Sequence, residues 1–244
     1  MRRVYVVSTA VRTAEPLASR SERSESAHTR LNDVGLLGTR KSSLRQRGIA
    51  RRDKLLQAAE TLLESREMDE ISLGDVALQA KVPKGSAYHF YLNIVDVYAS
   101  LVARYDKELQ AMMTAPLRGP VGAWPEVVEI LLDRAAEFYL RKPSARQLLV
   151  GPKTLPELKM RDRQNDVVIG RIFEDQVAGF FALPAVPKRS EVFFRSVEIA
   201  DLMFCLSMLR HGVITQEMTQ EAKRGSVAYL GSYFPAKLPR KKRS

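Results

Sequence analysis

Residues 71–91, ISLGDVALQAKVPKGSAYHFY, contain two short helical patterns on either side of a tight turn. The first pattern has apolar residues at the i, i+3, i+4, i+7 spacing of one helix face: Leu73, Val76, Ala77 and Ala80. Ser72 precedes this stripe and Asp75 stands at the third helical position, which is typical of an N-cap with a capping box. Pro83 suits the turn or the start of a second helix, expected over about residues 84–90. Two short helices joined in this way make a helix-turn-helix motif.

The second helix of the motif carries donors that could reach nucleic acid. In a helix-turn-helix this helix enters the major groove, where its exposed side chains contact base edges and phosphates. Lys84 stands at the helix N-terminus, whose free amides also attract phosphate, and Gly85 lets the backbone approach DNA closely. Three further residues could donate to phosphate oxygens: Ser86, Tyr88 and His89. Ser72 and Asn93, which read first as helix caps, are also candidates for contact with DNA. The motif therefore predicts double-stranded DNA as a partner.

The rest of the chain reads as further helices. Its 244 residues include only 13 Gly and 12 Pro, and long stretches rich in Ala, Leu, Glu, Arg and Gln favour helix over strand. One helix is expected before the motif, beginning at residue 45. After the motif, with Asn93 as an N-cap, helices are expected at about 95–114, 123–141, 144–150, 154–182, 188–211 and 215–233. We therefore expect an all-α protein with an N-terminal three-helix domain and a larger helical bundle.

Positive charge is concentrated at the two ends of the chain. Residues 1–54 carry 13 Lys+Arg against 5 Asp+Glu, and residues 237–244 carry five basic residues, within a formal net charge of +11. Residues 55–106, which hold the motif, carry 4 basic and 8 acidic residues. A basic arm can bind phosphates, bind an anionic membrane or keep a protein in solution. We expect this arm, including Arg47 and Arg51, to supply much of the electrostatic affinity for DNA.

The stretch IARRDKLLQAAETLLESREMDEISLGDVALQAKVPKGSAYHFY resembles the DNA-binding domain of the TetR/AcrR family of bacterial transcriptional regulators. The matching elements are Ala58-Ala59, Ser72, Val76-Ala77, Val82, Lys84-Gly85-Ser86 and Tyr88 within a Tyr-His-Phe string. The resemblance by motif covers about residues 47–100, and beyond it only the helical layout matches. It implies a repressor that binds a palindromic operator as a homodimer and is released by a small-molecule effector.

The chain departs from the family pattern at three places. Lys81 stands in the turn where the family usually has Gly, so a positive φ there would cost about 1 kcal/mol. Ile94 replaces a lysine that often contacts phosphate in the family. Gly74 leaves the start of the first motif helix without a side-chain contact.

The family layout also divides the chain into four segments. Residues 1–44 are expected to form a disordered basic arm, 45–95 the DNA-binding domain, 96–236 the ligand-binding and dimerisation domain, and 237–244 a basic solubilising tail. The single cysteine excludes an internal disulfide and suits a reducing cytoplasm. MRRVYVVSTAVRTA has the outline of a weak signal peptide, but Ser8 and Thr9 interrupt its apolar run. We therefore expect a cytoplasmic protein that does not span a membrane.

Helices from about residue 100 to 182 would enclose the effector pocket, and the last two helices would form the dimer interface. Candidate pocket residues, each equally suited to ordinary core packing, are Tyr105, Met112, Trp124, Leu131, Phe138, Val168, Ile172 and Phe173. Composition favours an apolar or aromatic effector. Candidate interface residues are Phe193, Val197, Ala200, Phe204, Ser207 and Met208.

Enzymatic chemistry has little support in the sequence. Its three histidines, His28, His89 and His211, show no metal-ligand spacing, and neither a phosphate-cradling Gly loop nor a nucleophile elbow is present. Cys205 lies in an apolar helix pattern and reads as an inert core residue. We therefore expect no catalytic residue, no metal and no cofactor.

Two alternative functions stay open at this point. A helical DNA-binding protein with no small-molecule ligand could act architecturally or through a protein partner. A filled bundle would favour this alternative, whereas a cavity of a few hundred Å³ would favour sensing. A helical enzyme or lipid-binding protein would need a polar cluster inside the bundle, and the sequence shows none.

Overall fold

The computed structural model describes residues 45–117 and 119–241, so the arm expected over residues 1–44 lies outside the described part of the chain. The described residues from 50 onward form one compact unit. The described residues are mainly helical and contain no strand, apart from an isolated bridge between Phe181 and Arg240. The all-α prediction is confirmed.

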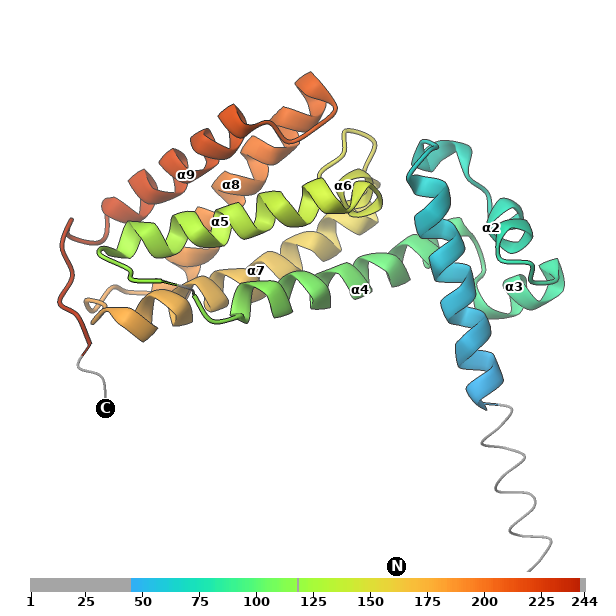
Figure 1. Ribbon diagram of the computed structural model, residues 1–244, viewed down its shortest axis with the longest axis horizontal. Helices are drawn as coiled ribbons and strands as arrows, with labels where there is room; N and C mark the ends of the chain where they lie inside the picture. Colours follow the sequence, from blue (N-terminus) through green and yellow to red (C-terminus); the bar gives the residue numbers. More distant parts are fainter. Residues whose placement is uncertain (1–44, 118, 242–244) are drawn as a thin grey trace, which may run out of the picture. The chain divides into compact units, whose positions relative to one another are not determined.

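The helices expected around the motif are present (Figure 1). A helix runs over residues 45–63, followed by α2 (Leu73–Gln79) and α3 (Lys84–Phe90). A single 3-10 turn that the sequence did not predict, η1 (Met68–Glu70), joins the first helix to α2. Ser72 caps α2 as predicted: its Oγ accepts from the Asp75 amide at 3.1 Å, and Asp75 Oδ2 accepts from the Ser72 amide at 2.9 Å.

Six further helices follow, close to the spans that the periodicity predicted. They are α4 (Ile94–Thr114), α5 (Trp124–Arg141), α6 (Pro143–Leu149), α7 (Pro156–Phe180), α8 (Arg189–His211) and α9 (Gln216–Gly231). Proline in the first turn marks the starts of α5, α6 and α7, where its missing amide costs no helical hydrogen bond. The domain boundary expected after residue 95 falls inside the first turn of α4.

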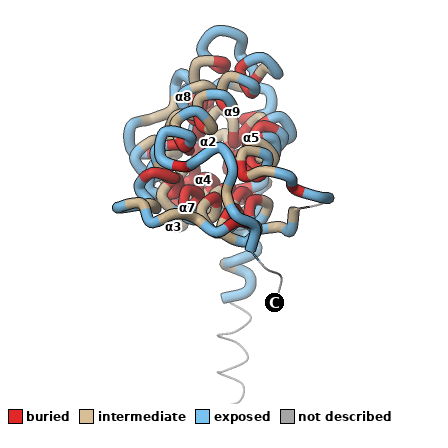
Figure 2. The backbone as a smooth tube through the Cα atoms, turned by 90° about the vertical axis from the view of Figure 1, so that its left-hand side faces the viewer, coloured by how far each residue is buried: buried red, intermediate tan, exposed pale blue. Residues whose placement is uncertain are grey.

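The helices of the body bury one face each, so the core lies between them (Figure 2). Helix α8 packs against both α7 and α9, α4 packs against α7, and α5 packs against α9. Where α7 crosses α8, a Cβ added at Gly170 would lie 2.7 Å from the backbone nitrogen and Cα of Phe194. The close approach of these two helices therefore requires glycine at this position.

The C-terminal segment, expected as a solubilising tail, is bound to the body over its described part. The Ala182 amide donates to the Pro239 carbonyl at 2.8 Å, and the Lys241 amide donates to the Phe180 carbonyl at 2.9 Å. These bonds fix the main chain near residues 239 and 241 beside the end of α7. No described helix is both long and apolar enough to span a membrane.

Candidate functional site

The turn of the helix-turn-helix is closed by main-chain hydrogen bonds. The Val82 amide donates to the Ala77 carbonyl at 3.0 Å, and the Lys81 amide donates to the Leu78 carbonyl at 3.1 Å. Lys81 has a φ of 53°, so it occupies the left-handed region that the family usually fills with glycine. Val82 is buried and anchors the turn in the core of the motif.

Helix α3 presents an open face of polar side chains. Lys84, Gly85 and His89 are exposed, Ser86 is partly exposed, and the Tyr88 side chain is 53% exposed. A Cβ added at Gly85 would meet no atom within 4 Å, so a ligand can approach the backbone there. Ala87, on the opposite side of α3, is fully buried. The predicted DNA-contacting residues of α3 are therefore accessible together on one short helix.

Gly74 lies beside the side chain of Lys84. A Cβ added at Gly74 would lie 3.6 Å from Lys84 Cε and 3.7 Å from Lys84 Nζ. The Lys84 stem therefore runs beside the first turn of α2. Distances of this size are ordinary contacts, so the structure does not require glycine at this departure from the family pattern.

Ser72 and Asn93, both predicted to contact DNA, serve as helix caps. The Ser72 hydroxyl closes the capping box of α2, and Asn93 Oδ1 accepts from the Asp96 amide at 3.0 Å at the start of α4. Both residues remain exposed. Their side chains therefore hold the ends of the helices on either side of α3, whatever else they contact.

The basic residues before the motif have different surroundings. Arg47 and Arg51 are exposed. Arg52 donates from Nε to the Tyr91 hydroxyl at 3.1 Å, and its guanidinium lies 5.4 Å from the centre of the Tyr91 ring. Arg52 therefore holds the first helix against Tyr91, a role that helical periodicity could not show because the partner lies 39 residues away.

Glu60 connects the first helix to the bundle. Its carboxylate accepts from Arg104 at 2.6 Å and from the Tyr105 hydroxyl at 3.1 Å, both on α4. The Tyr105 hydroxyl also lies 2.7 Å from Ser144 Oγ on α6. Burial is the main cause that raises the pKa of Tyr105 above its usual range, so this hydroxyl stays protonated and acts as a neutral link.

The structure separates the eight residues expected to line an effector pocket. Phe173 borders the cavity described below, whereas Val168 lies at the surface and is 39% exposed. Trp124 is buried and donates from Nε1 to the Pro235 carbonyl at 3.0 Å, which fixes the C-terminal segment against α5. The remaining five lie in the packed core or at its edge: Tyr105, Met112, Leu131, Phe138 and Ile172.

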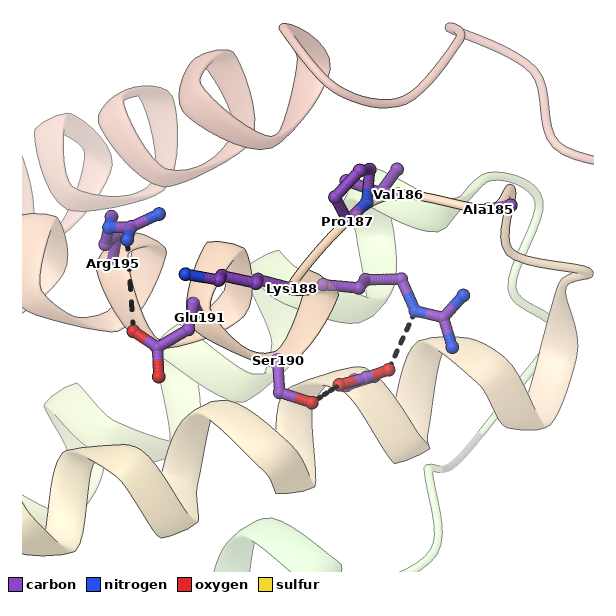
Figure 3. A pocket seen from close by; sticks show the side chains of 9 residues that line it. Ala185, Val186, Pro187, Lys188, Ser190, Glu191 and Arg195 are labelled. Carbon is purple, nitrogen blue, oxygen red and sulfur yellow. Dashed lines mark hydrogen bonds and ion pairs between the residues drawn. The ribbon is translucent and has the colours of Figure 1, made fainter.

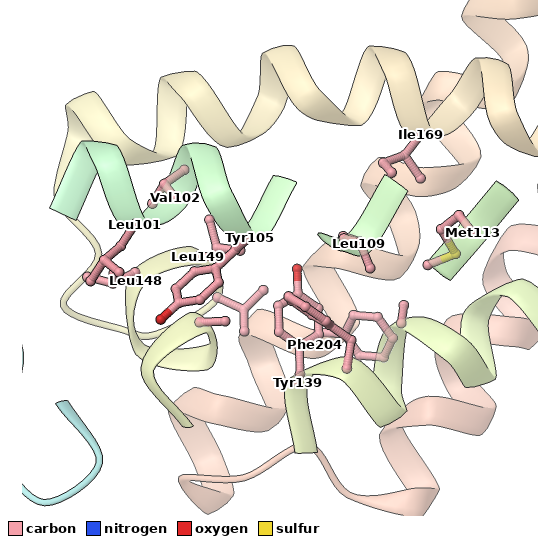
Figure 4. Packing of buried hydrophobic residues seen from close by; sticks show 14 of the residues in the cluster. Leu101, Val102, Tyr105, Leu109, Met113, Tyr139, Leu148, Leu149, Ile169 and Phe204 are labelled. Carbon is pink, nitrogen blue, oxygen red and sulfur yellow. The ribbon is translucent and has the colours of Figure 1, made fainter. Parts of the chain in front are cut away.

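A cavity of about 30 Å³ lies inside the bundle, between α4, α5, α7 and α8. Its walls are mostly apolar, but three polar residues face it: Tyr139, Asp166 and Asp201. Leu109 and Met113 of α4 lie near Tyr139 in the same part of the core (Figure 4). The volume suits about one or two water molecules and is far below the few hundred Å³ expected of an effector pocket.

A cluster of buried ionisable groups surrounds one side of this cavity. Lys159 Nζ lies 2.8 Å from Asp162 Oδ2 and 2.7 Å from Asp201 Oδ2. Asp166 is only 7% exposed, and its Oδ2 has no hydrogen-bond partner among the described residues. One carboxylate oxygen from each of Asp162, Asp166 and Asp201 lies within 4.8 Å of the others. Burial raises the pKa of Asp162 to about 6 and raises that of Asp166 well above the usual carboxyl range.

This cluster was not predicted from the sequence, although its spacing on α7 is visible there. Lys159, Asp162 and Asp166 repeat at the i, i+3, i+7 spacing, which places three ionisable residues on one face of α7. That face is buried against α8, which contributes Asp201. The expectation that the bundle contains no polar cluster is therefore wrong.

Two larger hollows open at the surface. One, of about 860 Å³, is lined by residues 185–191 with Glu174 and Arg195 (Figure 3). Glu174 there accepts from Arg189 at 2.7 Å and from Ser190 at 2.6 Å, so this carboxylate is already paired. The other, of about 850 Å³, runs along α4 and α7 and includes Val168. Neither hollow encloses a ligand-sized apolar space within the bundle.

The six residues predicted for the dimer interface are buried within their own chain, which corrects that prediction. All six lie on the inner face of α8: Phe193, Val197, Ala200, Phe204, Ser207 and Met208. The opposite face of α8 exposes Leu202 at 53% and Leu209 at 66%, with Ile199 and Leu206 partly exposed beside them. Helix α8 therefore has apolar residues on its exposed face as well as on its buried face, and the six predicted residues lie on the buried one.

Comparison with protein families finds a match in the bundle. A family model described as a tetracyclin repressor-like, C-terminal domain matches residues 122–234. No curated protein sequence matches the chain.

The alignments with solved structures of the same fold extend over nearly the whole length of those structures. A TetR-family transcriptional regulator from Streptomyces coelicolor aligns at a TM-score of 0.58 and 22% identity, covering 75% of this chain and 99% of that chain. The fatty acid degradation regulator FadR from Bacillus halodurans aligns at a TM-score of 0.52 and 15% identity, covering 74% and 95% respectively. At sequence identities of 22% and 15%, the similarity shows that this chain shares the fold of these proteins.

Proposed function

We propose that the chain is a transcriptional regulator of the TetR family that binds a palindromic operator as a homodimer through α3; its bundle matches a tetracyclin repressor-like C-terminal domain, and its fold is that of a TetR-family regulator of known structure. The accessible face of α3 supports this proposal: Lys84, Tyr88 and His89 are exposed on a helix that is anchored in the core of the motif by the buried Ala87. Helices held in this way can enter a major groove without further ordering. A regulator of this kind acts in the cytoplasm, and it needs no catalytic residue.

The homodimer is proposed from the outer face of α8. Leu202 and Leu209 are seven residues apart and lie on one side of the helix, with Leu206 between them. Exposed leucines in a row on a helix need a partner surface, and a two-fold axis lets the same stripe meet itself. Such a dimer would present two α3 helices to two half-sites.

Helix α4 is the proposed lever between effector and DNA. It begins at Ile94, four residues after α3 ends, and it contributes Leu109 and Met113 to the interior cavity. Arg104 and Tyr105 in the middle of α4 bind Glu60 of the first helix. An effector that widens the cavity would displace α4, and the ion pair would transmit this shift to the DNA-binding helices. Release from DNA on binding would make the protein a repressor.

The small cavity favours a second candidate, a DNA-binding regulator controlled by a protein partner instead of an effector. About 30 Å³ leaves no room for an apolar or aromatic effector in this conformation. The effector hypothesis therefore requires that the cavity open on binding. The buried carboxyl group of Asp166, whose Oδ2 has no hydrogen-bond partner among the described residues, is the reason to retain the effector hypothesis.

The test is footprinting of the intergenic DNA beside the protein's own gene at two salt concentrations. Tyr88→Ala is compared with wild type, and Tyr233→Ala is the matched control because Tyr233 is also surface-exposed, at 42%. A short protected palindrome that is lost in Tyr88→Ala alone would support the proposal. Diffuse, salt-sensitive protection that both variants retain would overturn it and leave nonspecific binding by the basic arm.

A further inference from the structure

Asp166 lies at the interior cavity with a carboxylate oxygen that has no partner. Among the described residues, its Oδ2 is one of few buried side-chain oxygens without a hydrogen bond, and the residue is 93% buried. A buried polar group normally finds a partner, because leaving one unpaired costs about 1–3 kcal/mol. The Oδ2 atom of Asp166 could therefore accept a hydrogen bond from a ligand in the cavity.

Carboxyl groups outnumber ammonium groups beside the cavity. Asp162, Asp166 and Asp201 bring three carboxyl groups together, and Lys159 is the ammonium that bonds to two of them. Arg163, which follows Asp162, is ion-paired with Glu198. The Lys159 ammonium is thus shared between Asp162 and Asp201, and a cation beside Asp166 would favour the ionised form of that carboxyl group.

From this arrangement we propose that the effector is an organic cation, with an ammonium group that binds between Asp166 and Asp201. The inference rests on the proposed effector-controlled regulator, and it replaces the apolar or aromatic effector that composition favoured. The cavity is large enough for an ammonium group, and its walls include the rings of Tyr139 and Phe204, 5.9 Å apart between centroids. Aromatic faces and carboxylates together suit an alkylammonium ion.

A divalent metal ion fits this site less well. Mg²⁺ and Ca²⁺ take six or more oxygen ligands, whereas most residues that line this cavity are apolar. The Lys159 ammonium also already lies between Asp162 and Asp201, within 2.8 Å of both. A metal would have to displace it, whereas an ammonium beside Asp166 would not.

The remainder of the effector must be apolar and must enlarge the cavity. About 30 Å³ accepts the head group, so a tail would have to move side chains of α4, such as Leu109 and Met113. Methionine is unbranched and adapts readily to a new shape. Displacement of these two residues would act on α4, which is the lever proposed above.

The test compares three probes of similar shape by isothermal titration calorimetry on the full chain: benzylamine, benzyl alcohol and benzoate. Wild type should bind benzylamine at least about tenfold more tightly than benzyl alcohol, and should not bind benzoate. Asp166→Asn should weaken benzylamine binding about thirtyfold or more while leaving benzyl alcohol unchanged. Asp175→Asn, which changes an exposed carboxylate on the same helix, should behave as wild type.

Two results would overturn the proposal: equal binding of benzylamine and benzyl alcohol, or benzylamine binding that survives Asp166→Asn. Manganese chloride alone is titrated as a further arm, and Asp166-dependent Mn²⁺ binding without benzylamine binding would assign the site to a metal instead. Should Asp166→Asn fail to fold, Asp166→Leu removes the carboxylate with an apolar side chain and gives the same comparison. Operator binding by the wild-type protein is measured in parallel without any probe. If wild type does not bind the operator, the proposed regulator itself is rejected. If wild type binds the operator but does not bind benzylamine, only the cation site is rejected.

Discussion

The side-chain amide of Gln147 donates a hydrogen bond of 2.8 Å to the Leu63 carbonyl, 84 residues earlier in the chain. The same amide donates to the Arg66 carbonyl at 2.9 Å, and its oxygen accepts from the Met68 amide at 3.1 Å. One side chain from α6 thus satisfies three main-chain groups at and just after the end of the first helix. This is a second connection, beside Glu60, between the bundle and the DNA-binding helices.

Gln147→Met should lower the free energy of unfolding by about 1–3 kcal/mol, because it leaves partly buried main-chain groups unpaired at nearly constant side-chain volume. Urea denaturation measures the change. Gln164→Met, at an exposed position on α7, is the control and should change stability by less than about 0.5 kcal/mol. An equal effect of the two substitutions would show that the Gln147 bonds do not stabilise the fold.

Lys81→Gly should stabilise the protein by about 0.5–1 kcal/mol, because Lys81 has a φ of 53° and glycine adopts this conformation without a Cβ clash. Thermal unfolding should show a rise of a few degrees in Tm. Lys81→Ala keeps the strained Cβ and serves as the control, in which no gain is expected. A lower Tm for Lys81→Gly than for Lys81→Ala would contradict the strain argument.

Cys205 should be almost unreactive toward thiol reagents in the native protein. Burial is the main cause that raises the pKa of the Cys205 thiol to about 12, and the Asp201 carboxylate adds to it. At pH 8 the native thiolate population should be about a thousandfold below that of an ordinary thiol. The rate of reaction with a disulfide reagent measures this, and the unfolded chain gives the reference. Similar native and unfolded rates would disprove the shielding.

The buried carboxyl of Asp106 should make the protein more stable in mild acid. Burial raises the pKa of Asp106 to about 6, against the opposing effect of Arg161 at 3.9 Å. Between about pH 4 and 6 the native state therefore binds more protons than the unfolded state, and stability falls as pH rises through this window. Asp106→Asn should flatten that part of the profile and raise stability at pH 7 by about 1 kcal/mol. Urea unfolding at several pH values checks this, and an unchanged slope would refute it.

Leu202→Glu combined with Leu209→Glu should convert a dimer into a monomer, because charged side chains would replace the apolar stripe on the outer face of α8. The dissociation constant should rise about a hundredfold or more, measured by sedimentation equilibrium. Leu140→Glu, at a position on α5 that is 51% exposed, is the control and should leave association unchanged. If the double variant associates as wild type does, the interface lies elsewhere.

Local sequence patterns determined the helices and the motif. The capping box of Ser72 and Asp75, the N-cap at Asn93 and the prolines at helix starts are interactions within one turn of helix, so residue types and spacing suffice to predict them. Pro83 likewise indicated where the second helix of the motif begins, and the structure has α3 at Lys84–Phe90. The strain at Lys81 followed from the turn itself.

The tertiary structure alone decided which face of each helix is buried and which distant residues meet. Helix α8 is apolar on both sides, so periodicity could not tell that Phe193 and Phe204 face the core while Leu202 and Leu209 face outward. Lys159 meets Asp201, 42 residues away, and Gln147 meets Leu63, because α7 crosses α8 and α6 lies against the first helix. Such contacts depend on how helices pack, and packing is set by the sum of all the buried faces and by close approaches such as that at Gly170.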